Sequence, residues 1–544
     1  MLKKNDKITV RIESCTSLGS GVGRYNGMTV FAANTAPGDL ALLHIIKVKP
    51  NYAVGKLEHL IEHSDMRIEP ECSVYSKCGG CAFSHIKYEE ELKIKQQQIE
   101  DNFKRIASLS PKINTIIGGQ NDKRYRNKAQ FPVSADTSGN AQIGFYSQHS
   151  HRVTDCRECL LQPEEFRAVT DVFRKWMKLY KISAYNESTR KGLLRHIYIR
   201  KAAVTGEIMV CAVINGDSLP FCDELVFELK EAIPSLKSFI ININKKDTNV
   251  VLGDKYINIF GDGYITDELC SMKFDISPQS FYQVNHDMAE VLYKKAAEYA
   301  CLTGKETVLD LYCGTGTIGL TLAKKAGCVI GVEVIPQAVE NAKENAQKNG
   351  ITNAEFICGD ADDAVKELKS RNISPDVVIL DPPRKGCSRE LLQTVAEFSP
   401  ERIVYVSCDS ATLARDCAVL AQLGYTAKEL TPVDMFPRTP HCETVVQLVR
   451  KKPDTYIDIT VDMVELDLTS SEAKATYEEI KDYIFDKHRV KVSSLYIAQV
   501  KQKHGIIERD CYNNSKKDNQ KQPQCPPEKV KLIEEALRHF KMIS

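Results

Sequence analysis

A cysteine at the end of a predicted strand is suited to nucleophilic chemistry. Cys408 follows the apolar run Arg402–Ser407 and precedes Asp409, where a helix should begin. A cysteine within a buried strand is usually an inert, small apolar side chain. At this strand end the N–H groups of the helix start should favour the thiolate, so the position predicts a nucleophile.

A glycine-rich turn, residues 313–319 (CGTGTIG), follows the strand predicted for residues 307–312 and opens a helix. Its glycines let a ligand approach the backbone, and the free N–H groups of the helix start can bind that ligand. The next strand ends at Glu333, whose carboxylate can bind the two hydroxyls of a ribose. The spacing fits NAD and S-adenosylmethionine equally, so the turn alone leaves both open. A helix start with no ligand is the structural alternative.

An acidic residue at another strand end separates these two cofactors. The strand Val377–Leu380 runs into Asp381, which two prolines follow. Open α/β sheets bind ligands at the carboxyl ends of their strands, where this carboxylate should lie. Asp-Pro-Pro at such a place is typical of methyltransferases and foreign to dehydrogenases, so we favour S-adenosylmethionine.

The elements that must position these groups form a doubly wound, Rossmann-like α/β domain at residues 271–450, where apolar strands alternate with helices. Residues 1–60 contain four or five short strands between glycine turns and predict a small β-barrel, either a structural cap or an RNA-binding module. Residues 61–270 form a mixed α/β central domain. Residues 451–544 form a small extension of unknown role, with a strand predicted at residues 457–468.

Length and charge exclude some classes of protein. The chain has 544 residues, which predicts several domains, and its 73 Lys and Arg against 72 Asp and Glu give no global attraction for nucleic acid. An RNA partner would therefore need local basic patches, and residues 123–128 and 195–201 are candidates, although such runs are often only solvated faces. No apolar run is long enough for a membrane span, and the N-terminus lacks a signal peptide. We expect a cytoplasmic protein with no membrane partner.

The 19 cysteines of such a protein should stay reduced, so their clusters indicate metal binding or catalysis. Cys72, Cys78 and Cys81 lie within ten residues, with two glycines between the last two. A fourth ligand can come from Cys156 or Cys159. Four thiolates can hold zinc or a four-iron cluster, and spacing does not choose between them. Unliganded core cysteines are the structural alternative.

Five motifs resemble, in the same order, those of the RNA uracil-5-methyltransferases that use S-adenosylmethionine. They are residues 277–285 (SPQSFYQVN), 310–314 (DLYCG), 381–386 (DPPRKG), 407–408 (SC) and 441–443 (HCE). The resemblance extends over about residues 1–450, because the barrel is similar to the TRAM domain of many members and the cysteine cluster is similar to their iron–sulfur site. Two neighbours depart from the family: its Asn-Pro after the nucleophile is Asp409-Ser410 here, and its His-Val-Glu is His-Cys-Glu.

The resemblance implies cofactor contacts at Gln283, Tyr312, Glu333 and Asp381. Glu333 would hold the ribose hydroxyls, and Tyr312 would lie at the glycine turn beside the methionine part. Asp360, at the end of the following strand, is a further candidate that could meet the adenine amino group.

The resemblance also implies the chemistry. Cys408 would add to the 6-carbon of uracil, which makes the 5-carbon nucleophilic enough to accept a methyl group. Glu443 would then remove the proton from the 5-carbon, and a sheltered carboxylate should have a raised pKa that suits this step. The target base must leave its stack, which favours single-stranded or loop RNA. The alternative for Glu443 is a solvated charge at a strand end.

For the cysteine cluster the resemblance selects Cys159 as the fourth ligand and a 4Fe-4S cluster as the group, with a structural or RNA-contacting role. The iron–sulfur cysteines together with the barrel favour 23S ribosomal RNA over transfer RNA as substrate. We expect a monomer. Two rival functions are a cytosine-5 or base-amino methyltransferase, and a non-catalytic iron–sulfur RNA-binding protein.

Overall fold

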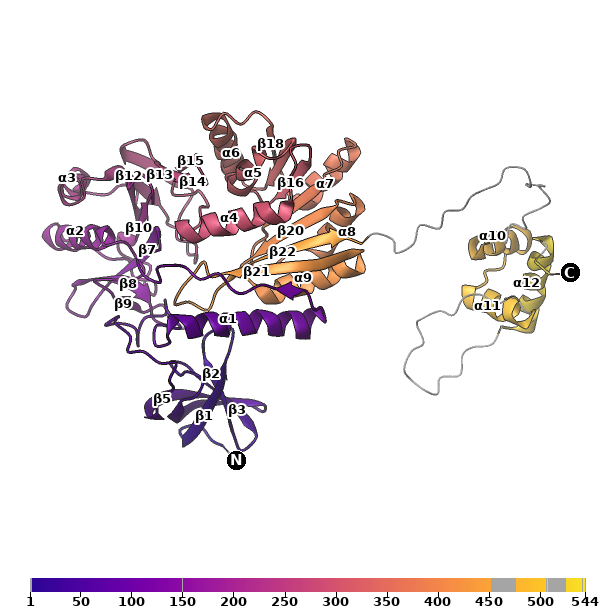
Figure 1. Ribbon diagram of the computed structural model, residues 1–544, viewed down its shortest axis with the longest axis horizontal. Helices are drawn as coiled ribbons and strands as arrows, with labels where there is room; N and C mark the ends of the chain where they lie inside the picture. Colours follow the sequence, from indigo (N-terminus) through magenta and orange to yellow (C-terminus); the bar gives the residue numbers. More distant parts are fainter. Residues whose placement is uncertain are drawn as a thin grey trace. The chain divides into compact units, whose positions relative to one another are not determined.

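The computed structural model describes residues 2–148, 150–451, 476–504, 506, 525–540 and 542–543. The chain divides into two compact units, Met1–Lys452 and Pro453–Ser544, and each is described by itself (Figure 1). The strand predicted at residues 457–468 lies outside the described residues. Among the described helices, none has the length and apolar character that a membrane crossing needs.

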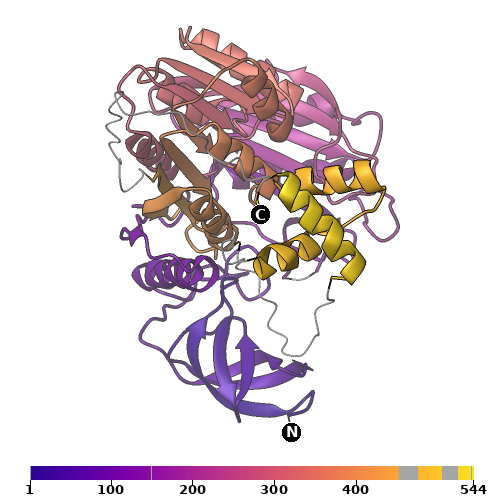
Figure 2. The ribbon, with the colours of Figure 1, turned by 90° about the vertical axis from the view of Figure 1, so that its right-hand side faces the viewer.

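The first unit begins with a closed five-stranded barrel, which confirms the predicted N-terminal barrel (Figure 2). Alternate residues of its first strand, Ile8, Val10 and Ile12, point into the barrel core, as the period of two along a strand requires. The strands, in their order around the barrel, are β1 (Lys7–Cys15), β2 (Gly21–Tyr25), β3 (Met28–Ala32), β5 (Tyr52–Glu62) and β4 (Leu40–Val48).

A seven-stranded sheet follows, and its strands are buried on both faces. Ile197 and Ile199 point to a core shared with α2 and α3, while Tyr198 between them points to a core shared with the C-terminal part of this unit. The strands, in sheet order, are β13 (Lys255–Phe260), β12 (Leu236–Ile243), β11 (Ile208–Ile214), β10 (Leu194–Lys201), β7 (Lys128–Ala135), β8 (Ala141–Tyr146) and β9 (Val153–Asp155); the helices are α2 (Glu165–Leu179) and α3 (Cys222–Ala232). The hairpin β14 (Ile265–Leu269) and β15 (Met272–Ile276) connects this sheet to the next.

An eight-stranded sheet completes the unit, with five parallel strands and an antiparallel pair beside them. Its order is β18 (Ala354–Cys358), β17 (Cys328–Glu333), β16 (Thr307–Leu311), β19 (Val377–Leu380), β20 (Arg402–Ser407), β22 (Glu443–Arg450), β21 (Tyr425–Val433) and β6 (Lys112–Ile113). One face packs on α4 (His286–Ala300), α5 (Thr317–Ala323) and α6 (Pro336–Lys348); the other packs on α7 (Ala361–Ser370), α8 (Arg389–Glu397) and α9 (Ser410–Gln422). The predicted doubly wound α/β fold is confirmed.

One segment that precedes residue 270 packs with the C-terminal sheet. α1 (Tyr88–Asn102) continues as a π-helix, Phe103–Ala107. Ile99 and Phe103 enter the core of the eight-stranded sheet, and β6 pairs in parallel with β21 at its edge. The segment therefore packs with the C-terminal sheet, because that sheet offers an unpaired edge and an apolar face beside α9.

The described residues of the second unit form three helices, α10 (Tyr477–His488), α11 (Ser494–Lys503) and α12 (Pro527–His539). Ile480, Ile497 and Ile533, one from each helix, are fully buried in a core of their own. Thr476 and Glu479 form a capping box at the start of α10, which satisfies free N–H groups of its first turn.

Candidate active site

The carboxyl end of the eight-stranded sheet gathers the predicted reactive groups. β19 and β20 are parallel neighbours, and Asp381 and Cys408 are the residues that follow them, so both lie at the same edge. β22 is antiparallel to β20 and pairs Thr444 with Ser407. This register brings Glu443, the first residue of β22, beside Cys408.

The pKa of the Cys408 thiol is raised to about 11. Burial is the largest cause, the negative charges of Glu443 and Asp381 add to it, and Arg384 opposes them. The prediction that the helix start favours a preformed thiolate is therefore wrong. The reason is that burial and the charges of Glu443 and Asp381 outweigh the helix start, whose free N–H groups donate to the Asp409 carboxylate at 2.9 and 3.1 Å.

The same contacts account for the Asp409-Ser410 sequence that departs from the family pattern. Asp409 is the N-cap of α9, a position that Asn and Asp fill equally well. Ser410 accepts a hydrogen bond from the Asn102 amide at 2.8 Å, which ties the start of α9 to α1. The substituted turn thus retains a capped helix directly after the cysteine.

Glu443 is only 4% exposed, and its pKa is raised to about 8. Burial is the main cause, the charge of Asp381 adds to it, and Arg384 lowers the pKa. The raised pKa expected for a sheltered carboxyl is confirmed, and the alternative of a solvated charge is excluded by the burial. Near neutral pH this group can hold or release a proton, as a general base requires.

Arg384 is the cation that faces both reactive groups. Its Nη2 lies 3.3 Å from Nε2 of His441, whose pKa is lowered to about 4 by burial and by Arg384. The imidazole is therefore neutral at physiological pH and can accept a hydrogen bond from the guanidinium. This contact keeps the positive charge of Arg384 close to Cys408 and Glu443.

Glu333 lies where the ribose-binding carboxylate was expected, at the end of β17. Its two oxygens accept from the backbone N–H groups of Gly314 and Ile335, at 3.0 and 2.9 Å. The carboxylate is therefore fixed against the glycine-rich turn that precedes α5. Its remaining lone pairs can bind hydroxyl groups of a ligand at the turn.

A buried aspartate that sequence reasoning missed as a site residue, Asp310, lies within β16. It accepts a hydrogen bond from Gly319 at 2.9 Å, while its second oxygen finds no partner among the described residues. Its pKa is raised to about 8 by burial and by Asp381, and burial raises the pKa of Asp381 to about 7. No Lys or Arg in the described structure pairs with either group, so these two carboxyl groups suit a positively charged ligand. The sequence signal that could have identified Asp310 is a carboxylate within an otherwise apolar strand.

The remaining predicted cofactor residues lie in two segments. Gln283 is 6% exposed, in the loop after β15, and its carbonyl accepts from the Asn127 amide at 2.8 Å. Tyr312 has a positive φ of 66° at the start of the glycine-rich turn. Its phenol faces Cys387, and its pKa is raised by burial, by Cys387 and by acidic residues at the start of α7, including Asp360. Tyr312 and Asp360 thus lie on the same side of the turn.

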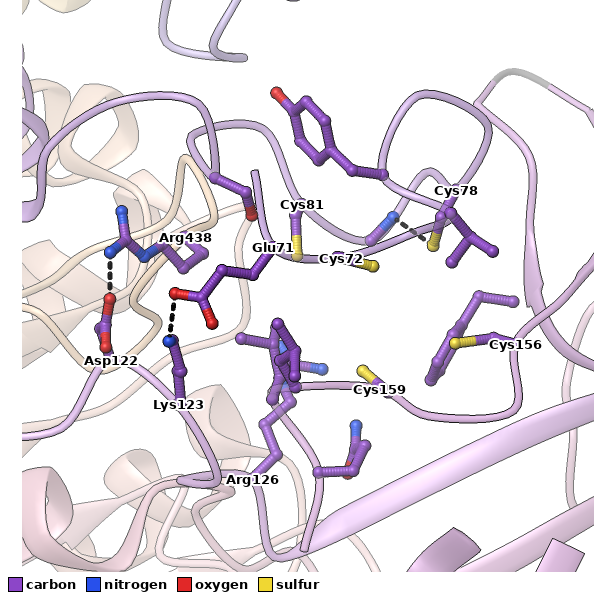
Figure 3. Close-up of a pocket in the computed structure, with 18 of the residues that line it drawn as sticks. Glu71, Cys72, Cys78, Cys81, Asp122, Lys123, Arg126, Cys156, Cys159 and Arg438 are labelled. Carbon is purple, nitrogen blue, oxygen red and sulfur yellow. Dashed lines mark hydrogen bonds and ion pairs between the residues drawn. The ribbon is translucent and has the colours of Figure 1, made fainter. Parts of the chain in front are cut away.

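The predicted metal-ligating cysteines line a second region, a cavity of about 110 Å³. Figure 3 shows the sulfur atoms of Cys72, Cys78, Cys81 and Cys159 facing its interior. The first three come from the loop before α1, and Cys159 comes from the loop between β9 and α2. Cys156 lines the same cavity, so both candidates for the fourth position are present.

The thiols of this cavity differ in acidity. The pKa of Cys159 is lowered to about 7, because Cys156 donates a hydrogen bond to it and the backbone N–H groups of Leu161 and Gln162 add to the effect. Burial raises the pKa of the loop cysteines Cys72, Cys78 and Cys81. Across the described residues, no group of three or more His, Cys, Asp or Glu side chains has the arrangement of a metal-ion site.

A buried ionic network braces the loop that leads from β21 into β22. The Lys95 ammonium lies 2.7 Å from carboxylate oxygens of both Glu91 and Asp434, and all three side chains are inaccessible to solvent. Glu91 also accepts from the backbone N–H of Arg438 at 2.8 Å. The loop before Glu443 is thereby fastened to α1.

Arg438 connects this brace to the cysteine cavity, which it also lines. Its carbonyl accepts from the N–H groups of Ala82 and Phe83, directly after Cys81, at 2.9 and 3.1 Å. Its guanidinium pairs with Asp122. The cysteine loop and the catalytic loop therefore share one residue, a connection that no local sequence pattern indicated.

The two basic stretches expected to contact RNA have different environments. Arg195, in the second stretch, is buried and donates to the carbonyls of Asn244 and Lys246 at 2.8 and 2.9 Å, so it is a structural residue. Arg126, Lys128 and Arg200 form a group of cations, with Lys128 opposite Arg200 across β7 and β10. Nitrogens of both arginines lack a partner among the described residues, and burial with the two arginine charges lowers the pKa of Lys128 to about 8.

The fold and the site define an S-adenosylmethionine-dependent methyltransferase, with a glycine-rich turn, an acidic residue at a strand end and buried carboxyl groups that no Lys or Arg of the described structure pairs with. Residues 87–451 match the family model described as tRNA (uracil-5-)-methyltransferase, and residues 2–57 match the TRAM domain. The chain belongs to this family of RNA methyltransferases. Residues 453–544 lie outside both matches.

Similar proteins agree with this assignment. An uncharacterised RNA methyltransferase of Clostridium acetobutylicum is 46% identical, over 82% of this chain and 98% of the relative; one of Halalkalibacterium halodurans is 43% identical, over 83% and 98%. The crystal structure of the tRNA (uracil-54, C5)-methyltransferase of Pyrococcus abyssi, in complex with S-adenosyl-L-homocysteine, is 28% identical, with a TM-score of 0.67 over 81% of this chain and 99% of that one.

Proposed function

We propose that this enzyme transfers a methyl group from S-adenosylmethionine to the 5-carbon of a uridine in RNA through a covalent adduct with Cys408. The observation that carries the proposal is the register of β20 and β22, which sets Cys408 beside the buried carboxyl of Glu443 at the sheet edge that also holds Asp381. A base-amino methyltransferase needs no such thiol, and a non-catalytic RNA-binding protein needs neither group.

The cofactor is held, in this proposal, by Glu333 at the ribose and by the acidic pair Asp310 and Asp381, whose unpaired negative charge suits a sulfonium and an ammonium. Gln283 and Tyr312 complete the contacts from the two sides of the turn, and Asp360 remains a further candidate at the adenine. When bound, S-adenosylmethionine supplies the methyl group that the 5-carbon receives.

The protein's own groups perform the remaining steps. Cys408 gives its proton to solvent water as its sulfur bonds to the 6-carbon, which moves electron density to the 5-carbon. After methylation, the Glu443 carboxylate removes the 5-proton, the double bond re-forms, and the Cys408 sulfur leaves. Arg384, which lowers the pKa of both groups, favours the thiolate for the first step and the carboxylate for the last.

RNA binding is supported by the half-buried cations Arg126 and Lys128; Arg200, opposite Lys128, is fully buried and donates to the carbonyl of Ser280 at 3.0 Å, so its charge acts from within the fold. Like charges opposite one another in a buried position are unfavourable unless an anion joins them, and RNA phosphates are the anions available to this enzyme. The backbone of Arg126 forms an isolated β-bridge with Asn285, two residues after Gln283. This group of cations therefore lies next to the loop that contains Gln283. We infer that the backbone beside the flipped uridine lies here.

The substrate we favour is 23S ribosomal RNA, on the combination of a TRAM barrel with the cysteine-lined cavity. Transfer RNA is the alternative, because the similar Pyrococcus abyssi enzyme acts on uracil 54 of transfer RNA. Mapping 5-methyluridine in both RNAs from cells with and without the gene distinguishes them. Loss from 23S ribosomal RNA supports our choice, and loss confined to transfer RNA overturns it.

We further propose that Cys72, Cys78, Cys81 and Cys159 hold a 4Fe-4S cluster. The proposal is supported by four thiols from two loops that face one cavity, because four cysteine thiolates are the ligand set of such a cluster. When bound, the cluster would cross-link the two cysteine loops; methyl transfer itself moves no net electrons. Iron and sulfide content after anaerobic purification tests this, and stoichiometric zinc without iron would contradict it.

A further inference from the structure

The second unit has a surface that neither the family nor the proposed active site explains. Residues 476–544 contain fourteen Lys and Arg against ten Asp and Glu, whereas residues 453–475 contain one Lys against six Asp and Glu. Within the three-helix unit the charge is also divided: Glu478, Glu479 and Asp482 occupy the first turns of α10, and basic residues gather at its other end.

An exposed aromatic ring marks that basic end. Phe485, in the last turn of α10, is 37% exposed although it is apolar. The guanidinium of Arg489 lies 5.6 Å from the centre of its ring and the ammonium of Lys491 lies 5.8 Å from it. Both cations belong to the short connection between α10 and α11, whose backbone is held by the caps at Arg489 and Ser493.

The start of α12 adds a third cation. Lys529 donates to the carbonyl of Lys491 at 2.9 Å and lies 5.9 Å from the ring of Tyr496. Among the described residues neither Lys491 nor Lys529 forms an ion pair, and Arg489 meets only Asp486, at 3.9 Å with both groups exposed. Phe485, Arg489, Lys491 and Lys529, here called the Phe485 surface, therefore carry an excess of positive charge around a flat ring.

We propose that the Phe485 surface binds single-stranded RNA outside the catalytic unit. A ring on which a base can stack, surrounded by cations that can neutralise adjacent phosphates, is the combination that sequence-tolerant RNA binding uses. Charge complementarity selects RNA over an apolar partner, because the two cations at the Phe485 ring and Lys529 beside Tyr496 would oppose burial against a hydrophobic face. The inference rests on the proposed function only in that the enzyme's substrate is RNA.

The test uses the full-length protein and a short fluorescent oligouridine, with affinity measured by anisotropy over a range of salt concentrations. The variant combines Phe485→Ala, Arg489→Gln and Lys491→Gln. We expect its Kd to rise by about fivefold or more from loss of stacking, and the slope of log affinity against log salt to fall by about 1.4 from loss of two phosphate contacts. Methylation at saturating RNA should stay unchanged.

The control removes a charge on another helix of the same unit. Lys503→Gln, at the end of α11, breaks a pair with Glu534 and should change Kd and slope little. Equal effects of the two variants would overturn the proposal, as would an unchanged Kd. Loss of binding to anionic phosphatidylglycerol vesicles with RNA binding intact would replace RNA by a lipid surface. Since the readout is RNA binding, it is independent of whether methyl transfer occurs at Cys408.

Discussion

Cys408 and Cys159 are the same residue type in one unit, yet their surroundings shift their acidity in opposite directions. Burial and the carboxyl groups Glu443 and Asp381 raise the pKa of Cys408 to about 11, whereas hydrogen bonds to Cys159 lower its pKa to about 7. The proposed nucleophile is protonated at neutral pH beside carboxyl groups, whereas the proposed cluster ligand receives hydrogen bonds. The neighbours of each cysteine, rather than its place at a helix start, set the pKa of its thiol.

Removing the sulfur of Cys408 or of Cys159 should produce the largest difference in effect between the active site and the cysteine cavity. Cys408→Ala should lower methyl transfer by more than about a thousandfold, because no other group can form the adduct. Its iron content and S-adenosylmethionine affinity should equal those of the wild type. Cys159→Ala should instead lower the iron content. Calorimetry, metal analysis and single-turnover assays measure these effects, and appreciable turnover by Cys408→Ala would remove the thiol from the mechanism.

Glu443→Gln tests the carboxyl group beside Cys408 that we propose as the general base. Loss of the base should lower kcat by about 10²–10⁴-fold, and the enzyme should accumulate a covalent complex with methylated RNA, because the sulfur cannot leave before the 5-proton does. Denaturing gels with labelled RNA detect that complex. A rate loss with no accumulation, in a variant that still binds RNA, would assign the proton transfer to another group.

Lys95→Met tests the brace that joins the regions. The substitution leaves Glu91 and Asp434 buried without their cation and should lower the free energy of unfolding by about 3–5 kcal/mol. Lys93→Met, two residues away at a largely exposed pair with Glu90, is the control and should change it little. Denaturant titration of the two variants measures the difference. Equal stability would show that the network does not hold the catalytic loop.

Arg384→Gln should produce the smallest effect and the most informative one. Arg384 lowers the pKa of Cys408 and of Glu443, so its loss raises both, and each reactive ionised form then appears at higher pH. The rising limb of the pH–rate profile for kcat should move upward by about one pH unit. Lys385→Gln, a neighbour for which this role is not proposed, should leave the profile in place. A downward shift would contradict the electrostatic account.

Much of the fold and the reactive pair could be predicted, since both follow from local patterns. Alternating strands and helices with a glycine turn indicate the doubly wound sheet, and the motif order selected Cys408 and Glu443. The brace could not be predicted, because Lys95 and Asp434 lie more than 300 residues apart and only packing unites them. The raised pKa of Cys408 could not be predicted, because the burial of its thiol and the nearness of Glu443 and Asp381 arise only in the folded chain.

The cysteine cavity also shows how far the sequence alone can predict a site. The spacing of Cys72, Cys78 and Cys81 indicates a common site, but the fourth position depends on a loop about 80 residues later. The structure brings both Cys156 and Cys159 to the cavity, so only their hydrogen bonding separates them. Asp310 was overlooked for a related reason. A residue within a buried strand is expected to belong to the core, and only the structure shows that one of its carboxyl oxygens has no partner among the described residues.

The central claim is the transient bond between the Cys408 sulfur and the 6-carbon of uracil. Its most direct test is incubation of the enzyme with S-adenosylmethionine and RNA that carries 5-fluorouridine at the target position, followed by mass spectrometry of the digested complex. Because fluorine cannot leave as a proton does, we expect a stable methylated adduct on the peptide that contains Cys408. Absence of a protein–RNA adduct under conditions where uridine RNA is methylated, or an adduct on another residue, would contradict the account.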